Sequence, residues 1–529
     1  MYMILKLETV DPSEPRSFKE AMRSPDADKW RTAMEKEVDG LQSLPCWRLV
    51  ARPTDGSKIQ RFKWVFTLKW KDGKIVREKA RLAVMGNLMR PGIDYHETSA
   101  PTAKSAHMKA FFAVANMMGW DIDVGDVTQA FPQADNEDFV VCEQPDGFDD
   151  GTGRVCELLR SLYGMPQAGR NWYKLLKAVL QKLGFKCCRH DTAIFTFTNA
   201  ELQIIYIIAT HVDDLHGTGP GGRKFWLWLW EQLNKKWIVS NDGEPTQTLG
   251  ITIDRDRSRG TLMLKQGHYI RNMLNELGWS SVKPADTPMD VGATFNLIDS
   301  PPLDEVDADV LRQYQTRCGA LNYVATWTRP DIAYAVSQAC AVMSRPASQH
   351  VSQLDRIAGY LTKFPDRGLM FNDSKSKIPQ LELYVDANFS GEKRNTTGFA
   401  VMLGGAVISH GSQRQKHAAT STAMSEYHAA GSGVAMVYGI AHLLKEWGFP
   451  QCGIPVYEDN TSCIAFGENA QISDASKQIR SKYHFVRELI EEGMVKFVKT
   501  ASEDQAADPL TKALPKALFH KLTYRIMGS

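Results

Sequence analysis

The sequence lacks long apolar runs and lacks an excess of charge of either sign. Its longest apolar runs, such as residues 204–209, fall well short of the roughly 18 residues that a membrane-spanning helix needs. The 63 basic side chains nearly cancel the 61 acidic ones. A nucleic-acid site would therefore have to be a local basic groove, and a membrane span is not expected.

Export signals and disulfide spacings are missing as well. The N-terminal residues MYMILKLETVDPSEP contain one short apolar stretch, but no basic leader and no small-residue cleavage site. The nine cysteines are odd in number, scattered and never spaced as CxxC. Adjacent Cys187 and Cys188 are not a usual disulfide pair, so we expect reduced thiols in a soluble protein of the cytosol or nucleus.

The composition is that of a folded chain. Of the 529 residues, 43% are hydrophobic and 23% are charged, which excludes disorder as the general state. At roughly 150 residues per domain, the length suggests about three folded units.

Hydrophobic spacing in the first half of the chain predicts alternating helices and strands. Residues 17–44 have helical spacing, with apolar residues three or four positions apart. Two strand-like runs flank Asp72-Gly73, a typical hairpin turn, and their polar positions are mostly cationic. The other expected elements are helices at 104–118 and 168–183, a strand at 120–127, and a strand pair on either side of Asp213-Asp214.

The second half contains two segments without periodicity, residues 284–309 and 364–379. Between them, residues 314–361 have helical spacing, and after them the order becomes strand, strand, strand, helix, strand. The sequence therefore predicts an α/β (α+β) fold, in which two α/β units of catalytic size are joined by a helical connector.

Adjacent aspartates end the apolar strand IIYIIATHV. Burying unpaired charge is costly, so Asp213 and Asp214 are either solvent-exposed turn residues or neutralised by a cation. Asp126, in DIDVGDVTQAF, ends another short extended segment. Three carboxylates on neighbouring strand ends could hold two Mg²⁺ ions, which prefer oxygen ligands. Such a pair activates an attacking hydroxyl and stabilises a leaving pyrophosphate in an in-line displacement.

Several sequence blocks occur in an order typical of one family. The blocks KARLAVMGNLMRPGIDYHETSAP, DVTQAF, EQPDGF, SLYGMPQAGRNWY and HVDD together resemble the reverse transcriptase of copia-type LTR retrotransposons. LGITI, LKQGHYI, TRPDIAYAV and AADPLTKAL match further on, so the resemblance runs from about Trp30 to the C-terminus. It implies a right-hand polymerase unit of fingers and palm, a helical connection and a ribonuclease H-like mixed-sheet domain.

The resemblance implies roles for residues of the polymerase unit. The catalytic, metal-binding acids would be Asp126, Asp213 and Asp214. Phe131 would exclude a ribose 2′-hydroxyl, although an ordinary core aromatic is the alternative. The remaining substrate-binding residues would be Gln167, against the incoming nucleotide, and Lys79 and Arg81, on its triphosphate.

Without the resemblance, Lys79 and Arg81 would be solvated hairpin charges. Leu249-Gly250 resembles the turn that grips the primer end. Both interpretations depend on the tertiary structure.

The C-terminal unit has a second acidic set at the ends of predicted elements: Asp386, Glu426, Asp459 and Asp508. Any one of them alone would be a surface charge or a helix cap. As an ordered set they resemble the catalytic, metal-binding centre of ribonuclease H, where two cations lie near the scissile phosphate. Residues 409–416 could contact phosphate or form a solvated hairpin, and we favour the hairpin.

The resemblance also implies the cofactors, partners and organisation. Each centre would bind two Mg²⁺ ions, with Mn²⁺ as the alternative, and the helical connector would set the spacing between centres. The expected partners are an RNA template, a DNA primer, the RNA–DNA hybrid, deoxynucleoside triphosphates and other polyprotein segments such as integrase. The expected location is the cytoplasm, in a virus-like particle, with the nucleus as a second site. The expected domains are 1–45, a lead segment; 46–290, reverse transcriptase; 291–378, connection; and 379–529, ribonuclease H-like.

The sequence departs from the family pattern at four places. His211 stands where Tyr is usual, and Pro132 follows Phe131, the residue expected to exclude the 2′-hydroxyl. Met85 replaces a usual Lys, and Gln478 replaces a usual His. The preferred hypothesis is an RNA-directed DNA polymerase with ribonuclease H. The alternatives are a catalytically silent relic that only binds nucleic acid, and a nuclease whose first unit is a clamp. The sequence shows no integrase-type or aspartic-protease motif, so we expect part of a longer polyprotein in which Met1 is not necessarily the start.

Overall fold

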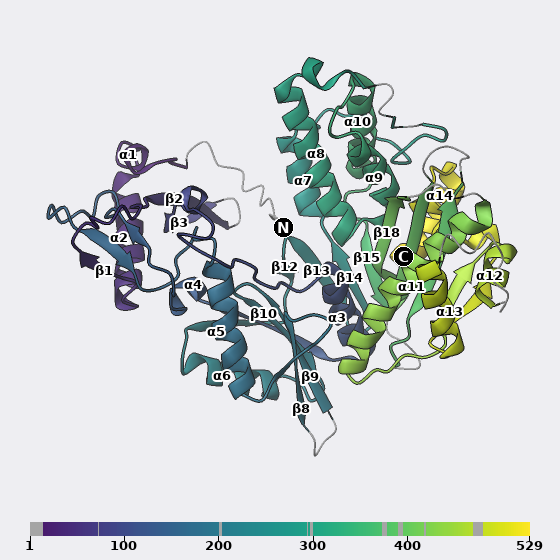
Figure 1. Ribbon diagram of the computed structural model, residues 1–529, viewed down its shortest axis with the longest axis horizontal. Coiled ribbons are helices and arrows are strands. Elements are labelled where there is room, and N and C mark those ends of the chain that lie inside the picture. The colour runs from purple at the N-terminus through teal and green to yellow at the C-terminus, as the bar shows by residue number, and fades with distance from the viewer. Residues whose placement is uncertain are drawn as a thin grey trace.

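The computed structural model has a mixed α/β fold, as predicted (Figure 1). Within the described residues the strands form five sheets, and no helix there is long and apolar enough to cross a membrane. All nine cysteines are free thiols. The structure describes residues 14–71, 74–199, 204–293, 295–296, 300–372, 378–389, 395–416, 419, 421–468 and 480–528.

The N-terminal unit combines helices with a long hairpin at one end of the molecule (Figure 1). The predicted helix at 17–44 is present as two helices, α1 (Phe18–Ala21) and α2 (Ala27–Ser43). Strands β2 (Phe62–Lys71) and β3 (Lys74–Val84) pair antiparallel as predicted, whereas the Asp72-Gly73 turn lies outside the described residues. A small sheet completes this unit: β1 (Trp47–Val50), β5 (Val141–Cys142) and β6 (Val155–Leu158).

A six-stranded sheet, called the palm sheet below after the unit that the resemblance predicts, has the order β11-β4-β10-β9-β8-β7. Its strands are β4 (Asp121–Val127), β7 (Lys186–Cys187), β8 (Ile194–Asn199), β9 (Ile204–His211), β10 (Asp214–Gly219) and β11 (Val239–Gly243). Helices α5 (Ala168–Lys182) and α6 (Lys224–Asn234) share a core with one face of this sheet. Helix α3 (Ser105–Met117) shares a core with the other.

Alternation along the strands determines which side chains reach which face. In β4, Asp123 accepts a hydrogen bond from the Trp230 indole of α6 at 2.8 Å, so Asp123 faces α6. Asp126 is three residues on and therefore faces the α3 side. In β10, the ring of His216 lies 6.4 Å from that of Phe112 in α3. Asp214, two residues earlier, shares this face with His216.

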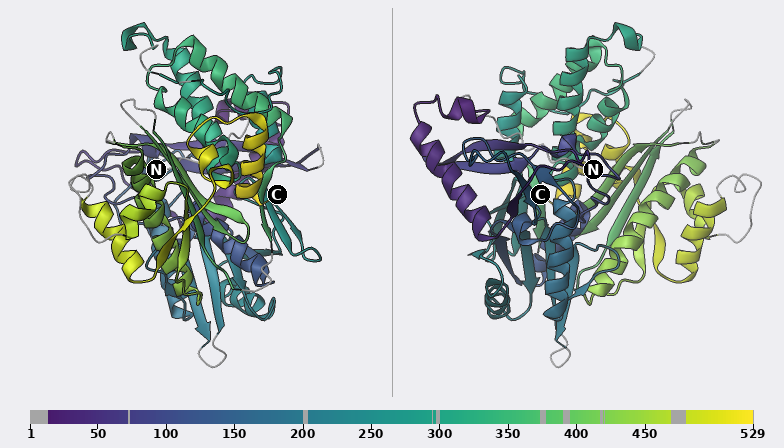
Figure 2. Two further views of the ribbon diagram at one scale, coloured as in Figure 1. Left: turned by 90° about the vertical axis from the view of Figure 1, so that its right-hand side faces the viewer. Right: turned by 60° about the vertical axis from the view of Figure 1, so that its left-hand side comes forward.

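The helical region interrupts a four-stranded sheet. Strand β15 (Gly368–Asn372) follows the helices and pairs with β14 (Thr261–Lys265), which precedes them. The other two strands are β12 (Gln247–Thr248) and β13 (Ile251–Asp256). The helices are α7 (Gly267–Glu276), α8 (Ala308–Trp327), α9 (Ala333–Ala341) and α10 (Ser348–Lys363). All four helices share one apolar core with residues of α14 (Lys516–Met527), and they lie together above the sheets (Figures 1 and 2).

The C-terminal sheet has the mixed topology expected of a ribonuclease H-like domain. Its order is β18-β17-β16-β19-β20, with the first three strands antiparallel and the last two parallel to β16 and to each other. The strands are β16 (Glu382–Asn388), β17 (Thr396–Leu403), β18 (Ala406–Arg414), β19 (Ile454–Glu458) and β20 (Val495–Lys499). The helices are α11 (Thr422–Glu446), α12 (Thr461–Glu468) and α13 (Arg480–Glu491).

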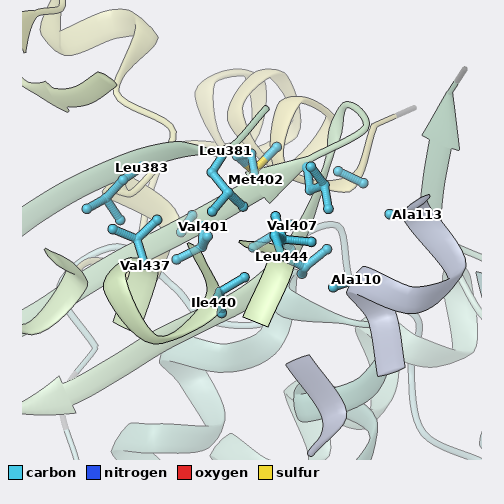
Figure 3. Close-up of a cluster of buried hydrophobic side chains, with 14 of the residues drawn as sticks. Ala110, Ala113, Leu381, Leu383, Val401, Met402, Val407, Val437, Ile440 and Leu444 are labelled. Carbon is cyan, nitrogen blue, oxygen red and sulfur yellow. The ribbon is translucent and has the colours of Figure 1, made fainter. Parts of the chain in front are cut away.

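One continuous core joins the palm to the C-terminal sheet. Helix α3 is buried along almost its whole length, and its Ala110 and Ala113 lie beside Val407 of β18 and residues of α11 (Figure 3). A helix with no exposed face needs apolar partners on all sides. The two predicted catalytic units therefore pack directly against each other.

Lys109 of α3 is a basic residue buried in this core. Its ammonium donates to the carbonyl of Thr326 in α8 at 2.9 Å, and burial lowers the pKa of Lys109 from 10.5 to about 7. His410 of β18 faces it, and burial together with Lys109 lowers the pKa of His410 to about 3. Between pH 7 and 10.5 the folded chain therefore releases a proton that the unfolded chain still binds, so stability rises with pH in that window.

We expect Lys109→Met to stabilise the protein at pH 7, where the wild-type chain loses on the order of 4 kcal/mol to the buried ammonium. The gain should shrink toward pH 10. Urea unfolding at pH 7 and at pH 9.5 measures this difference. An equal loss of stability at both pH values would contradict it and would show that the bond to Thr326 matters more than the charge.

Candidate active sites

Strand pairing brings the first three predicted carboxylates together. Asp126 of β4 lies directly opposite Asp214 of β10 in the antiparallel register. Asp213 lies in the two-residue turn between β9 and β10. A carboxylate oxygen of each residue lies within 4.8 Å of the others, which suits shared binding of divalent cations.

The turn that carries Asp213 is strained. Val212 has φ of 61°, a conformation that β-branched residues rarely adopt. The Trp172 indole of α5 donates to the Val212 carbonyl at 2.6 Å, and the Val127 amide donates to the Asp213 carbonyl at 3.3 Å. Such strain persists only where neighbouring contacts hold it, which is common at functional sites.

His211, which stands where the family usually has Tyr, is the last residue of β9 and comes just before this turn. Burial lowers the pKa of His211, and the neighbouring Asp213 carboxylate opposes that shift. The imidazole is therefore neutral at pH 7, and it adds no fixed positive charge beside the carboxylates.

Arg81 and Phe131 meet at Tyr163, which we did not identify from the sequence. The Arg81 guanidinium lies 5.2 Å from the centre of the Tyr163 ring, and the Phe131 ring lies 5.1 Å from it. Burial raises the pKa of Tyr163 to about 12; Asp213 and Asp126 add to this shift, whereas Arg81 opposes it. Two predicted substrate-binding residues thus pack against one aromatic ring, whose pKa is raised in part by the charges of Asp213 and Asp126.

Phe131 belongs to α4 (Ala130–Gln133), a single helical turn. Pro132 is buried within this turn. Its missing amide does little harm there, because the first amides of a helix have no partner within the helix.

Two glycines bring the Tyr163 loop against the hairpin of β2 and β3. The Val84 amide at the end of β3 donates to the Tyr163 carbonyl at 2.7 Å. A Cβ on Gly164 would collide with the Val84 carbonyl, and one on Gly86 would collide with the Gly164 carbonyl. Met85 lies between these contacts, and its amide donates to the Arg61 carbonyl at 2.9 Å. Backbone hydrogen bonds therefore hold Met85 in position.

Gln167 is buried just before α5. Its amide nitrogen donates to Asp138 at 3.1 Å and to Asn136 at 3.4 Å. Its side-chain oxygen has no hydrogen-bond partner among the described residues. None of the hydrogen bonds found for Gln167 in the described part of the chain joins it to the carboxylates.

Lys79 and Arg81 lie two residues apart on β3, but their side chains have different neighbours. It lines a cavity of about 320 Å³ between α2 and β3, beside Lys36 and Glu37. Burial lowers the pKa of Lys79, and Arg81 adds to the shift. Glu37, which the sequence did not identify, accepts a hydrogen bond from the Leu82 amide at 3.3 Å. Burial raises the pKa of Glu37, and the Leu82 bond, Arg81 and Lys79 oppose that shift.

The second site gathers three acids around the C-terminal sheet. Asp386 comes from β16, Glu426 from the first turns of α11, and Asp459 directly follows β19. One carboxylate oxygen of each lies within 4.8 Å of the others. Burial raises the pKa of Glu426 to about 10, with Asp386 as the next cause. Burial also raises the pKa of Asp386.

Asp508 lies beside this trio together with Lys512. Burial raises the pKa of Asp508 to about 7, and the Asp386 carboxylate adds to the shift. The Lys512 ammonium lies 2.9 Å from Asp508 and 3.9 Å from Asp386, and Thr511 donates a hydrogen bond to Asp386. Lys512 therefore offsets part of the negative charge.

Glu458 is a further acid that the sequence did not identify. It ends β19, is fully buried and accepts a hydrogen bond from the Asn460 amide at 2.8 Å. Burial raises its pKa to about 8, and Asp386 and Asp459 contribute. The signal was available, since Glu458 and Asp459 are adjacent in YEDN, as Asp213 and Asp214 are in HVDD. Gln478 lies outside the described residues.

The donor sets at both sites fit Mg²⁺. Each supplies three carboxylates, the hard ligands that this ion prefers. In the second site, Oε2 of Glu426 is buried and has no hydrogen-bond partner among the described residues. A buried oxygen without a donor is costly, and a bound cation would satisfy it.

Comparisons with known proteins agree with this arrangement. Residues 45–291 match the family described as "Reverse transcriptase (RNA-dependent DNA polymerase)". The retrovirus-related Pol polyprotein from transposon RE1 of Arabidopsis thaliana is 33% identical over 521 residues, covering 97% of this chain and 34% of that protein. The one from transposon TNT 1-94 of Nicotiana tabacum is 31% identical over 518 residues, covering 96% and 38%.

A solved structure of the foamy viral protease-reverse transcriptase in complex with RNA/DNA hybrid is 11% identical, with a TM-score of 0.45, covering 92% of this chain and 55% of that chain.

Residues 45–291 therefore form a reverse transcriptase domain. The chain as a whole is similar to the copia-type, retrovirus-related Pol polyproteins of transposons. It spans about a third of the length of the relatives it matches.

The contact between the Tyr163 loop and β3 can be tested with Gly164→Ala. Gly164 has φ of 85°, and Gly92 has φ of 79° with nothing within 4 Å of its Cβ position. Both alanines pay the left-handed penalty of about 1–2 kcal/mol, but only Gly164→Ala also collides with the Val84 carbonyl. We expect Gly164→Ala to lower the free energy of unfolding by about 1–3 kcal/mol more than Gly92→Ala, measured by urea titration. Equal losses would contradict the close approach.

Proposed function

We propose that the chain is an RNA-directed DNA polymerase with a ribonuclease H, each dependent on Mg²⁺. The observation that carries this proposal is the presence of two separate carboxylate clusters, one on the palm sheet and one on the C-terminal sheet. Mn²⁺ is the alternative ion, because the carboxylate donors do not discriminate strongly between the two.

In the polymerase centre, Asp126, Asp213 and Asp214 would hold the ions. Bound Mg²⁺ would activate the primer hydroxyl and stabilise the leaving pyrophosphate. Arg81 would bind the triphosphate of the incoming deoxynucleotide, where charge-assisted bonds to phosphate are strong. The position of Arg81 against Tyr163 supports this role. Lys79, which lines the cavity between α2 and β3, would supply a second positive charge.

Phe131 and Gln167 would select and support the nucleotide. The Phe131 ring packs edge-on against Tyr163, so it would be held firmly enough to exclude a 2′-hydroxyl. Gln167 has an unused side-chain oxygen, which could accept a hydrogen bond from a nucleotide.

In the nuclease centre, Asp386, Glu426, Asp459 and Asp508 would hold the ions. Bound Mg²⁺ would direct water at the scissile phosphate of the RNA strand. Lys512 would neutralise charge around Asp508 and would move toward solvent or phosphate as cations bind. Recognition of RNA would use 2′-hydroxyls in the minor groove, which distinguish RNA from DNA.

The proposed partners follow from the two reactions. They are an RNA template, a DNA primer, the RNA–DNA hybrid and deoxynucleoside triphosphates, with other polyprotein segments such as integrase. The direct packing of the palm on the C-terminal sheet supports passage of one hybrid from the first centre to the second. We propose action in the cytoplasm, in a virus-like particle, with the nucleus as a second site, and we retain the domain limits at residues 45/46, 290/291 and 378/379.

The two centres can be separated by single substitutions. Asp213→Asn removes one negative charge from the first cluster, so primer extension on an RNA template should fall at least about a hundredfold. Cleavage of a labelled RNA–DNA hybrid should be retained. Glu426→Gln should do the reverse.

Asp121→Asn is the matched control, because Asp121 begins the same strand as Asp126 but pairs with Arg257 at 2.7 Å. An exposed pair of this kind contributes little, so both activities should persist. Loss of both activities in Asp213→Asn would contradict separate centres. Wild-type protein that binds hybrid yet incorporates no deoxynucleotide with Mg²⁺ would favour the catalytically silent relic, and hybrid cleavage without incorporation would favour the nuclease with a clamp.

Metal binding has a thermodynamic signature. Mg²⁺ at about a hundred times its Kd should stabilise the folded chain by about 2.7 kcal/mol for each independent site. Thermal unfolding with and without MgCl₂, against NaCl of equal ionic strength, measures the effect. Glu426→Gln should lose the nuclease part of the gain and Asp213→Asn the polymerase part. An unchanged gain in both variants would place the ions elsewhere.

A further inference from the structure

The turn between β12 and β13 has an unusual backbone. Its two residues, Leu249 and Gly250, have φ of 51° and 70°. Positive φ at both central positions is typical of a type I′ hairpin turn, which favours Asn or Gly. Leucine in the first position is strained, so contacts around it must hold the turn in shape.

A hydrogen bond attaches this turn to the strand of the catalytic carboxylates. Thr248, the last residue of β12, shares a 2.6 Å hydrogen bond with Nε2 of His216 in β10. His216 is fully buried and lies two residues after Asp214, on the same face of the palm sheet. The turn therefore lies on the side of the sheet to which Asp126 and Asp214 point, and Gly250 is exposed there.

The helical region holds the turn from the other side. The Tyr323 hydroxyl of α8 donates to the Leu249 carbonyl at 2.5 Å, and a Cβ on Gly250 would lie 3.4 Å from the same hydroxyl. The Tyr269 ring of α7 packs edge-on against Tyr323 at 5.0 Å. Burial raises the pKa of Tyr323 to about 12, so its hydroxyl stays protonated and keeps donating throughout the neutral range.

We propose that Tyr323 is a positioning residue for the primer strand. By fixing the Leu249 carbonyl, it keeps the exposed backbone of Gly250 in place on the face of the sheet that carries Asp214, where the 3′ end of the primer must lie for its hydroxyl to react. The proposal rests on the polymerase function proposed above. It also gives the helical region a defined task, because any movement of α8 is transmitted to the turn through one hydrogen bond.

The test is Tyr323→Phe, which removes only the hydroxyl. Tyr314→Phe is the matched control, because Tyr314 lies on the same helix and donates to the Ala339 carbonyl at 3.2 Å inside the helical core. Both variants lose one hydroxyl-to-carbonyl bond. With the full chain, a DNA primer on an RNA template and Mg²⁺, we expect Tyr323→Phe to raise the KM for primer–template about three- to tenfold. The KM for deoxynucleotide and the rate of hybrid cleavage should stay within about twofold of wild type.

Each outcome has a distinct meaning. A rise in primer–template KM in Tyr323→Phe, absent from Tyr314→Phe, supports the proposal. Equal KM values in the two variants, with wild-type protein active, overturn it, as does a parallel loss of extension and hybrid cleavage at unchanged KM, which indicates a general structural role. Wild-type protein without any incorporation overturns the polymerase function itself, so the two failures are distinguishable.

Discussion

The antiparallel register between β4 and β10 is the constraint on which the rest of the structure depends. It places Asp126 opposite Asp214, and a slip of one residue would turn one of these carboxylates to the opposite face. The register is fixed from that opposite face, where the Trp230 and Trp226 rings of α6 occupy the space beside Gly125 and Gly217. A glycine in a strand interior weakens it, yet here the two glycines let a tryptophan-rich helix approach the sheet closely. Helix α6, whose apolar run contains three tryptophans, therefore helps to determine the face of the sheet on which the carboxylates lie.

The two acidic clusters meet the repulsion between like charges in different ways. The cluster of Asp126, Asp213 and Asp214 lies at strand ends with none of its three residues buried, so water can screen it. The acidic set on the C-terminal sheet is largely buried, and the pKa values of Glu426, Glu458 and Asp508 are raised to about 10, 8 and 7. Protons and the Lys512 ammonium then balance charge that water cannot reach. Cation binding at the second site must displace those protons, which couples metal affinity to pH more strongly there than on the palm.

The local hydrophobic pattern was sufficient to predict several helices and strands near the site. The strand that contains Asp126, the hairpin at Asp213-Asp214 and the amphipathic helix α5 lie where periodicity predicted them. The ordered motifs identified the acids that the fold brings together. What periodicity could not supply is long-range. Tyr163 and Glu37 are ordinary residues until the loop after β6 and helix α2 pack against β3. Lys79 and Arg81 share a strand face, yet one meets α2 and the other meets Tyr163. Strand β15 pairs with β14 although the whole helical region separates them in the sequence. Local periodicity cannot predict a strand partner about a hundred residues away.

The helical region was expected to set the distance between the two centres, but the packing divides that task. Helix α3 belongs to the palm and is buried against β18 and α11 of the C-terminal domain (Figure 3). A helix packed on all sides transmits displacement because protein interiors are nearly incompressible. The two carboxylate clusters are therefore held at a fixed spacing by α3. Helix α8 contacts α3 through the bond from Lys109 to the Thr326 carbonyl and contacts the Leu249–Gly250 turn through Tyr323. Under the proposed function, α8 would support the primer end through this turn. Under the proposed function, the spacing between the two clusters and the position of the primer end would thus depend on different elements.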